Sequence, residues 1–232
     1  MRIADMSWKQ VEDYLTADDR CILPLGSTEQ HGGLSLCVDA ILAERVAVEA
    51  AEPLAVPVYP AMPFGCCPYF SAFPGTISLR VETLLAVVRD CIASLHTSGF
   101  RRVLIVNGHG GNSAVGNLLR ELMSARPDMS LKLHNWWTGP QVMAKAIEIA
   151  PDPSHANWFE NFPWTRLAGV SLSKTEKPMV DAARLRVSGP ERTRQLLGDG
   201  SFGGAYQVSD ADMKDLWAVG VEETRSELEL PW

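Results

Sequence analysis

The sequence lacks the long hydrophobic run that a membrane-spanning helix needs. Its longest apolar stretches fall far short of the ~20 residues that cross a bilayer, and the N-terminal segment MRIADMSWKQ has no apolar core of signal-peptide length. Of its 232 residues, 46% are hydrophobic and 21% are charged, a composition typical of a globular protein. We therefore expect a soluble, cytoplasmic protein with no membrane partner, in which residues 1–232 form one domain.

The sequence also has little positive charge and no paired cysteine motif. Lys and Arg total 21 against 28 Asp and Glu, and this balance opposes the phosphate neutralisation that supplies most nucleic-acid affinity. Nucleic acid is therefore not an expected partner. The five cysteines show no CxxC spacing, so neither a disulfide framework nor a thiolate zinc site is indicated. We interpret them, including the adjacent Cys66 and Cys67, as reduced thiols without an assigned function.

Short apolar runs alternate with amphipathic stretches along the chain. Runs typical of buried strands lie at residues 21–26, 55–59, 103–106 and 131–137. Helical spacing of apolar residues covers 38–52, 81–98, 115–123 and 141–150, and a glycine at position 99 is placed to end the second of these helices. The alternation predicts an α/β fold: a three-layer sandwich with a mainly parallel central sheet and helices on both faces.

One long segment between these elements is rich in proline. Residues 53–74 contain six of the fifteen prolines, and proline disfavours both helix interiors and central strands. Beyond the short run near residues 55–59, we expect this segment to be irregular. A loop of this length inside a compact domain usually has a function.

Two predicted loops that follow strands carry side chains suited to metal binding. Glu29 and His31 lie two residues apart after the first strand, so an extended backbone directs both to the same side. Asp39 begins the next helix, and His109 follows the strand at 103–106. Because open parallel sheets place ligands at the carboxyl ends of their strands, the two loops can share one site. These oxygen and nitrogen donors suit zinc, manganese or iron.

Simpler interpretations of both loops remain open at this point. Asp39 could cap the helix that it begins, and Glu29 and His31 could be solvated loop residues. The glycine-rich turn NGHGGN, residues 107–112, could also hold a phosphate group. It has neither GxGxxG spacing nor a Walker lysine, and an imidazole at its centre would crowd a phosphate. A non-catalytic nucleotide-binding module is therefore a less favoured alternative.

Four segments of the chain carry a family pattern. They are LPLGSTEQHG with Asp39, FPGTISL at residues 73–79, NGHGGN, and His155-Ala156 with Glu160. In order and spacing they resemble the creatininase family of metal-dependent amidohydrolases, and the later segment LLGDGSFGGAYQVSDADMK resembles its weaker C-terminal pattern. The resemblance covers about residues 20–165. It implies a three-layer α/β fold and a homo-oligomer, commonly a hexamer.

The resemblance also implies a metal cofactor of two divalent ions, Zn, Mn or Fe, bridged by an aspartate and a water. One ion would be held by Glu29, Asp39 and His109, and the other by His31, Asp39 and Glu160. Creatinine-cleaving members carry a glutamate where this chain has Gly111. Glu160 is therefore the expected carboxylate ligand, and the substrate cannot be copied from creatinine.

The expected catalytic residues are His155 and Glu160, which keep the five-residue separation found in relatives. His155 would stabilise the tetrahedral oxyanion or pass a proton to the leaving nitrogen, a role that suits an imidazole titrating near neutrality. Relatives often place a glutamate and a histidine where this chain has Trp158 and Phe70. We therefore expect an aromatic substrate-binding wall, made by Trp158, Phe70, Tyr69 and Trp164.

Together these features predict a dinuclear metal-dependent amidohydrolase. Its substrate would be a small molecule, a cyclic or aromatic-bearing amide, lactam or formamide, whose C–N bond is cleaved by metal-activated water. The enzymatic alternative is a peptidase that trims a short peptide, as some relatives of this family do. An aromatic, proline-walled pocket favours the compact substrate.

Overall fold

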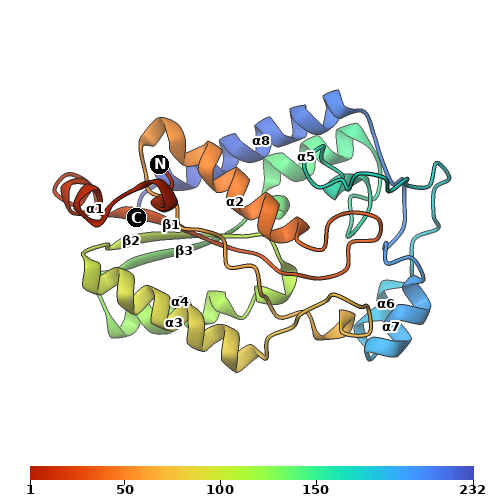
Figure 1. The fold of residues 1–232 in the computed structure, drawn as a ribbon, viewed down its shortest axis with the longest axis horizontal. Coiled ribbons are helices and arrows are strands. Elements are labelled where there is room, and N and C mark those ends of the chain that lie inside the picture. The colour runs from red at the N-terminus through yellow and green to blue at the C-terminus, as the bar shows by residue number, and fades with distance from the viewer.

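The computed structural model describes residues 1–232 and is built around a sheet of three parallel strands (Figure 1). The strands are β1 (Arg20–Leu25), β2 (Arg102–Asn107) and β3 (Ser130–Asn135), in the order β1-β2-β3. Their register pairs Arg20 with Arg102 and Arg102 with Ser130. The five residues after the first are buried in both β1 and β2, as expected of strands covered on both faces.

Helices cover both faces of the sheet, which confirms the predicted three-layer α/β sandwich (Figure 1). One layer contains α2 (Val38–Ala51), α5 (Pro140–Ile149) and α8 (Asp210–Glu229). The opposite layer contains α3 (Val81–Ser98) and α4 (Val115–Ala125). Alternate strand residues supply the two cores, because successive side chains of a strand point to opposite faces. In β2, Leu104 packs with the first layer and Ile105 with the second.

The proline-rich segment is irregular, as predicted, but the short strand expected at residues 55–59 does not form. Val58 makes only isolated bridges, one to Ile22 and one to Arg2. Pro57 and Pro60 flank it, and because neither has a backbone N–H to donate, a continuous ladder cannot extend along this edge. Two 3₁₀ turns, Glu52–Leu54 and Pro68–Phe70, interrupt the segment.

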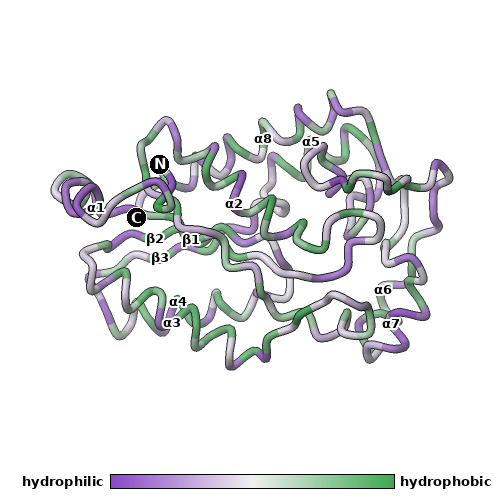
Figure 2. Tube along the Cα trace, in the orientation of Figure 1, coloured by the Kyte–Doolittle hydropathy of each residue, from purple (hydrophilic) through white to green (hydrophobic).

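Three short helices were not expected from the hydrophobic pattern. They are α1 (Trp8–Tyr14), α6 (Ala182–Arg186) and α7 (Pro190–Leu197). Figure 2 shows that α1 and α7 are mostly hydrophilic, so apolar periodicity could not reveal them. Polar start signals mark α1 and α6 instead: Ser7 forms a capping box with Gln10, and Asp181 accepts hydrogen bonds from the first turn of α6.

Four further 3₁₀ turns lie between the main elements or near the N-terminus. They are Ile3–Asp5, Gly110–Asn112, Trp136–Thr138 and Trp158–Glu160. The helix α3 ends as predicted at Gly99, whose φ of 112° is the left-handed conformation that glycine adopts most readily. None of the helices is long and apolar enough to cross a membrane.

Candidate metal centre

The five predicted metal ligands come together at the carboxyl ends of the strands. Glu29 and His31 lie in the loop after β1, Asp39 in the first turn of α2, His109 after β2, and Glu160 in the turn Trp158–Glu160. Asp39 is central: its Oδ1 lies 3.0 Å from His31 Nε2 and its Oδ2 lies 2.9 Å from His109 Nδ1. Glu29 Oε1 is 3.3 Å from His109 Nδ1, and Glu160 Oε2 is 3.7 Å from His31 Nε2.

Both imidazoles are held by their other ring nitrogen. His31 Nδ1 lies 3.1 Å from the Glu29 carbonyl oxygen, and His109 Nε2 lies 3.0 Å from the Cys66 carbonyl oxygen. A ring nitrogen held against a carbonyl directs the opposite nitrogen, Nε2 of His31 and Nδ1 of His109, at the carboxylates. Proteins orient metal-binding histidines in this way.

Two asparagines fix the turn that carries His109. The Asn107 side chain donates to the His109 carbonyl oxygen at 2.7 Å and accepts from the His109 N–H at 3.1 Å. Asn112 donates to Asn107 Oδ1 and to the Gly26 carbonyl oxygen, each at 3.1 Å. The network ties the turn to the end of β1, so the two loops keep a constant relative position.

The glycines Gly108 and Gly111 let the turn pack closely against neighbouring backbone, and they do not form an open phosphate-binding loop. A Cβ at Gly108 would overlap the Asp39 carbonyl oxygen, and one at Gly111 would overlap the Cys66 carbonyl oxygen. The space beside these glycines is therefore filled by the chain itself. This packing argues against the nucleotide-binding alternative, because a phosphate loop must leave its N–H groups open to the ligand.

Opposed charges govern the electrostatics of the cluster. Burial raises the pKa of Glu29 and raises the pKa of Glu160 to about 7. Burial alone would lower the pKa of His31, but the Asp39 and Glu160 carboxylates outweigh it and raise that pKa to about 10. Burial alone would likewise raise the pKa of Asp39, yet the adjacent His31 and His109 hold it well below its usual range. Three carboxylates enclosed together need positive charge nearby.

The donor atoms of the cluster fit a metal ion. Glu29 Oε2 is buried without a hydrogen-bond partner, and His31 Nε2, although 3.0 Å from Asp39 Oδ1, makes no well-aligned hydrogen bond. This is an uncommon and costly state for buried polar atoms that a bound cation would relieve. Donor atoms of His31, Asp39 and Glu160 all lie within 4.8 Å of one another. Glutamate oxygen and histidine nitrogen are ligands that Zn²⁺ and Mn²⁺ accept.

Sequence reasoning missed several residues around this cluster. Ser27 donates to Asp39 Oδ2 at 2.7 Å and so orients the carboxylate between the two imidazoles. The Cys67 thiol lies within 4.8 Å of donor atoms of Glu29 and His109, although the cysteines were given no function. Neither residue belongs to a motif with recognisable spacing, so only the fold could place them here. All five cysteines are free, as expected.

His155 lies beside the cluster with a different set of contacts. Its Nδ1 faces the carboxylates of Glu29 and Glu160, each at 3.9 Å. Its Nε2 lies 3.0 Å from the backbone oxygen of Gln30 and 2.8 Å from the side-chain nitrogen of the same residue. Burial, together with the charge of His31, holds the pKa of His155 well below its usual range. The ring is therefore neutral, unlike the expected imidazole titrating near neutrality.

A cavity of about 310 Å³ opens onto the cluster. Tyr69 lines it, as predicted for the substrate wall, together with Phe202, Phe159 and Trp137. Phe70 is fully buried and lies behind the site, with its ring stacked on His155 at a centroid distance of 4.7 Å. The cavity wall is thus aromatic, but the sequence identified only part of it.

Three of the four predicted wall residues do not line the cavity: Phe70 lies behind His155, and the two tryptophans lie elsewhere. Trp158 is fully buried in the core, and its ring nitrogen donates to the Pro151 carbonyl oxygen at 3.0 Å. Trp164 packs edge-on against Trp217, with the Arg45 guanidinium 3.8 Å above its ring. Neither lines the cavity. Adjacent residues of the turn Trp158–Glu160 point to different sides, so nearness to Glu160 in sequence did not place Trp158 at the cluster.

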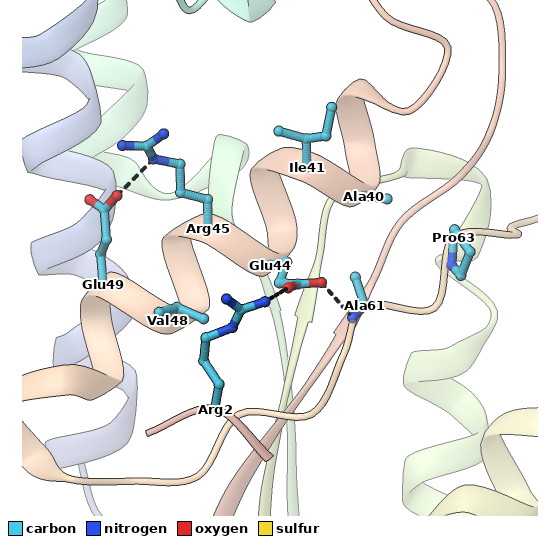
Figure 3. A pocket seen from close by; sticks show the side chains of 9 residues that line it. All are labelled: Arg2, Ala40, Ile41, Glu44, Arg45, Val48, Glu49, Ala61 and Pro63. Atoms are coloured by element: carbon cyan, nitrogen blue, oxygen red, sulfur yellow. Dashed lines mark hydrogen bonds and ion pairs between the residues drawn. The ribbon is translucent and has the colours of Figure 1, made fainter. Parts of the chain in front are cut away.

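A larger surface depression lies away from this chemistry, on the outer side of α2 (Figure 3). Its charged side chains are paired with one another: Arg2 with Glu44 at 3.2 Å and Arg45 with Glu49 at 2.7 Å. Glu49 also accepts a hydrogen bond from the ring nitrogen of Trp217. Because these charges are already satisfied, the depression has no unpaired group to bind or activate a substrate.

Comparisons with known proteins place the chain in a family. The sequence model of the creatininase family, described as creatinine amidohydrolase, matches residues 4–228. The chain is 33% identical over 164 residues to the creatinine amidohydrolase of Pseudomonas putida, covering 65% of this chain and 63% of that protein. It is 39% identical over 100 residues to a mycofactocin precursor peptide peptidase of Mycolicibacterium smegmatis, covering 39% of each.

These alignments span less than two thirds of the curated relatives. The structural match is more extensive. The fold superimposes on a solved structure, creatininase Mn, with a TM-score of 0.77 and 25% identity, covering 100% of this chain and 99% of that one.

Proposed function

Because the chain belongs to the creatininase family, whose sequence model matches nearly its whole length, we propose that it is a metal-dependent hydrolase that cleaves a carbon–nitrogen bond of a small amide. One observation carries this proposal. The two oxygens of the buried Asp39 carboxylate each face a different imidazole, His31 and His109. Such a carboxylate can serve two ions at once, whereas a helix cap or an ordinary ion pair would not need two histidines.

The cluster divides into two donor sets of the kind that divalent ions accept. Glu29, Asp39 and His109 would hold one ion, and His31, Asp39 and Glu160 would hold the other, as Zn, Mn or Fe. When bound, such ions lower the pKa of a water and polarise a carbonyl oxygen. The similarity to the creatininase Mn structure supports divalent metal binding, and the buried atoms of Glu29 and His31 that lack a well-aligned hydrogen bond support the same placement.

His155 is the residue placed to handle a proton. Gln30 anchors its Nε2. The Phe70 ring, stacked at a centroid distance of 4.7 Å, and the Phe202 ring, tilted at 4.9 Å, hold its plane. Its Nδ1 is left facing the cluster. A fixed imidazole there can accept a proton at Nδ1 and deliver it to the nitrogen that leaves the cleaved amide.

The cavity wall indicates a compact substrate with an apolar part. Tyr69, Phe202, Phe159 and Trp137 give the wall aromatic surface, and no basic side chain lines it besides the two histidines, His109 and His155. An aromatic or cyclic group can therefore pack there, with stacking contributing about 0.5 to 1.5 kcal/mol beyond burial. Recognition of a strongly charged group close to the ions is not favoured.

A peptidase is the second candidate, because a matched relative is described as a peptide peptidase. The cavity of about 310 Å³ accommodates a small amide or one residue rather than an extended chain. We also expect a homo-oligomer, a hexamer by family resemblance, and a cytoplasmic location. Light scattering of the purified protein would measure the oligomer.

Hydrolysis of a substrate panel tests the proposed function. The metal-loaded protein is incubated with lactams, formamides, aromatic primary amides and short peptides, and the released amine or acid is quantified. We expect turnover of at least one compact amide, and none by the Asp39→Ala variant. Faster cleavage of peptides than of all amides would assign the peptidase function, and no turnover of any amide or peptide would contradict both.

A further inference from the structure

A second cavity adjoins the metal cavity and has no role in the chemistry described so far. This side pocket has a volume of about 380 Å³ and is lined by Tyr69, Ala182, Leu185, Arg186, Ser188, Thr193 and Phe202. Tyr69 and Phe202 also line the metal cavity. The two cavities therefore meet at these two rings, and a ligand in either contacts the same aromatic side chains.

The walls of the side pocket are held by a small core of their own. Cys67, Phe70 and Leu197 are buried together and connect α7 to the turn Pro68–Phe70, with Leu185 of α6 packed against them. Figure 1 shows α6 and α7 together beside the loops at this end of the molecule. Arg194 of α7 adds a hydrogen bond of 2.8 Å to the carbonyl oxygen of Ala72. The side pocket is therefore part of a packed unit.

Polar groups in the side pocket lack partners within the protein. Thr193 is only 2% exposed, and its hydroxyl has no hydrogen-bond partner. A buried hydroxyl of this kind costs free energy unless a ligand or water satisfies it. Arg186 forms no ion pair with any acidic residue, whereas the nearby Arg184 lies 3.7 Å from Asp181. The guanidinium of Arg186 is thus available to an anion.

We propose that the side pocket binds a second part of the substrate, an apolar substituent that ends in a carboxylate. This inference rests on the proposed function, because the amide itself would lie at the metal cluster. Ala182, Leu185 and the rings of Tyr69 and Phe202 contact the apolar part. Arg186 pairs with the carboxylate, and the Thr193 hydroxyl donates to it. The cationic group of the site thus lies on the far side of the aromatic wall, away from the metal ligands.

Matched hydroxamates test this arrangement by direct binding. A hydroxamate group chelates the metal ions, and its tail reports on the side pocket. Calorimetry with the metal-loaded protein compares hexano- and octanohydroxamate with the monohydroxamates of adipic and suberic acid, which replace the terminal methyl by a carboxylate. We expect at least one acid-ended compound to bind about three- to tenfold more tightly than its methyl-ended partner, as a partly exposed ion pair allows.

Variants assign that preference to particular residues. Arg186→Gln should abolish it, and Thr193→Val should reduce it about two- to fivefold through loss of one hydrogen bond. Arg192→Gln is the matched control, because Arg192 lies on α7 but does not line the side pocket. It should keep the full preference. Metal content and circular dichroism of each variant verify that the fold and the cluster are intact.

The outcomes separate this inference from the proposed function. Acetohydroxamate, which has no tail, tests the metal cluster alone, and its failure to bind would count against the metal proposal. If acetohydroxamate binds but neither acid-ended compound is preferred, the side-pocket inference is wrong and the proposed function stands. A preference that persists unchanged in Arg186→Gln would also overturn the inference, because the carboxylate would then be recognised elsewhere.

Discussion

His155 is close enough to the cluster to be either a metal ligand or a proton-handling group. Its Nδ1 lies 3.9 Å from the carboxylates of Glu29 and Glu160 and forms a hydrogen bond with neither. As a proton-handling group, it can be removed without dismantling the cluster. We expect His155→Ala to retain its metal ions and to lose roughly 10²- to 10⁴-fold in kcat, the usual range for acid–base groups. Elemental analysis and turnover of the best amide substrate measure both quantities.

The control for this change is a histidine remote from the cluster. His96 is on α3 and pairs with Asp128 at 2.7 Å near the surface, so His96→Ala should alter neither metal content nor turnover. A metal-depleted His155→Ala protein would show that His155 is a ligand, and the division of roles proposed above would then be incorrect.

A substitution at Trp158 distinguishes a role in core packing from a role in substrate binding. Its side chain is fully buried in the core, so Trp158→Ala should destabilise the protein by about 3 to 5 kcal/mol. Since ~1 kcal/mol shifts the melting temperature of a domain of this size by about 2 to 4 °C, the loss is readily seen in a thermal scan. Substrate preference should not change.

The complementary change is at the cavity wall. Tyr69→Leu alters a residue that lines the metal cavity, and it should raise KM for an aromatic amide more than for an aliphatic one. If Trp158→Ala changed this preference while leaving the melting temperature intact, the buried position of Trp158 would be contradicted.

At the scale of elements, the turn after β2 must approach the start of α2 closely enough for His109 to reach Asp39. Gly108 allows that approach, because a Cβ there would overlap the Asp39 backbone oxygen. We expect Gly108→Ala to cost about 1 to 3 kcal/mol, as overpacking does, and to weaken metal binding by separating the two ligands. Denaturant unfolding and metal titration measure these effects.

Gly110 provides the matched control in the same turn. A Cβ at Gly110 would meet no atom within 4 Å, so Gly110→Ala should unfold at nearly the same denaturant concentration as the wild type. Equal destabilisation by both substitutions would mean that the flexibility of the turn, and not its packing against α2, explains the glycines.

The N-terminal ends of β1 and β2 lie at the edge of the sheet opposite the metal cluster, and an ion-pair network joins them. This network makes the stability of the fold depend on pH. Asp18 lies 2.6 Å from Arg20 and 3.1 Å from Arg102. Burial alone would raise the pKa of Asp18, but the hydrogen bonds and charge of Arg20, with Arg102, lower it below its usual value of 3.8. The ionised carboxylate therefore stabilises the fold above pH 3.8, and this contribution is lost as the pH falls toward the lower pKa of the folded state.

The isosteric Asp18→Asn variant tests this dependence. At pH 7 it should be less stable than the wild type by about 1 kcal/mol, the usual size for a partly exposed charged hydrogen bond. At pH 3 the difference should narrow, because below pH 3.8 the Asp18 carboxyl of the unfolded wild-type chain takes up a proton, which stabilises the unfolded state. A difference that stays constant from pH 7 to pH 3 would show that charge at Asp18 contributes nothing.

For the whole molecule, the sequence predicted the layers, and which candidate ligand side chains the fold brings together, better than it predicted the lining of the cavity. The runs in β1 and β2 are continuous and apolar because both faces of the sheet are covered. Such a run can be recognised within a few consecutive residues of the sequence. Ligand positions such as His109 followed from strand ends, where the topology of a parallel sheet brings loops together. These features depend on short segments that the sequence shows directly.

The remaining features depend on contacts between distant segments. Whether Trp158 points to the core or to the cavity is decided by the turn that carries it, including the hydrogen bond to Pro151. The side pocket needs α6 and α7 to pack on the proline-rich loop, and α7 has a hydrophilic sequence without apolar periodicity. Thr193 and Arg186 meet Tyr69 only through that packing.

The central claim is that Asp39 serves two ions in one buried cluster. Elemental analysis by mass spectrometry of protein purified without chelator tests it most directly. We expect about two divalent ions per chain, because the cluster offers too many donors for one tetrahedral ion with an open position. Asp39→Ala should lose both ions, and His109→Ala should lose mainly one. A single ion per chain at saturation, undiminished metal content in Asp39→Ala, or full activity of metal-free protein would contradict the account.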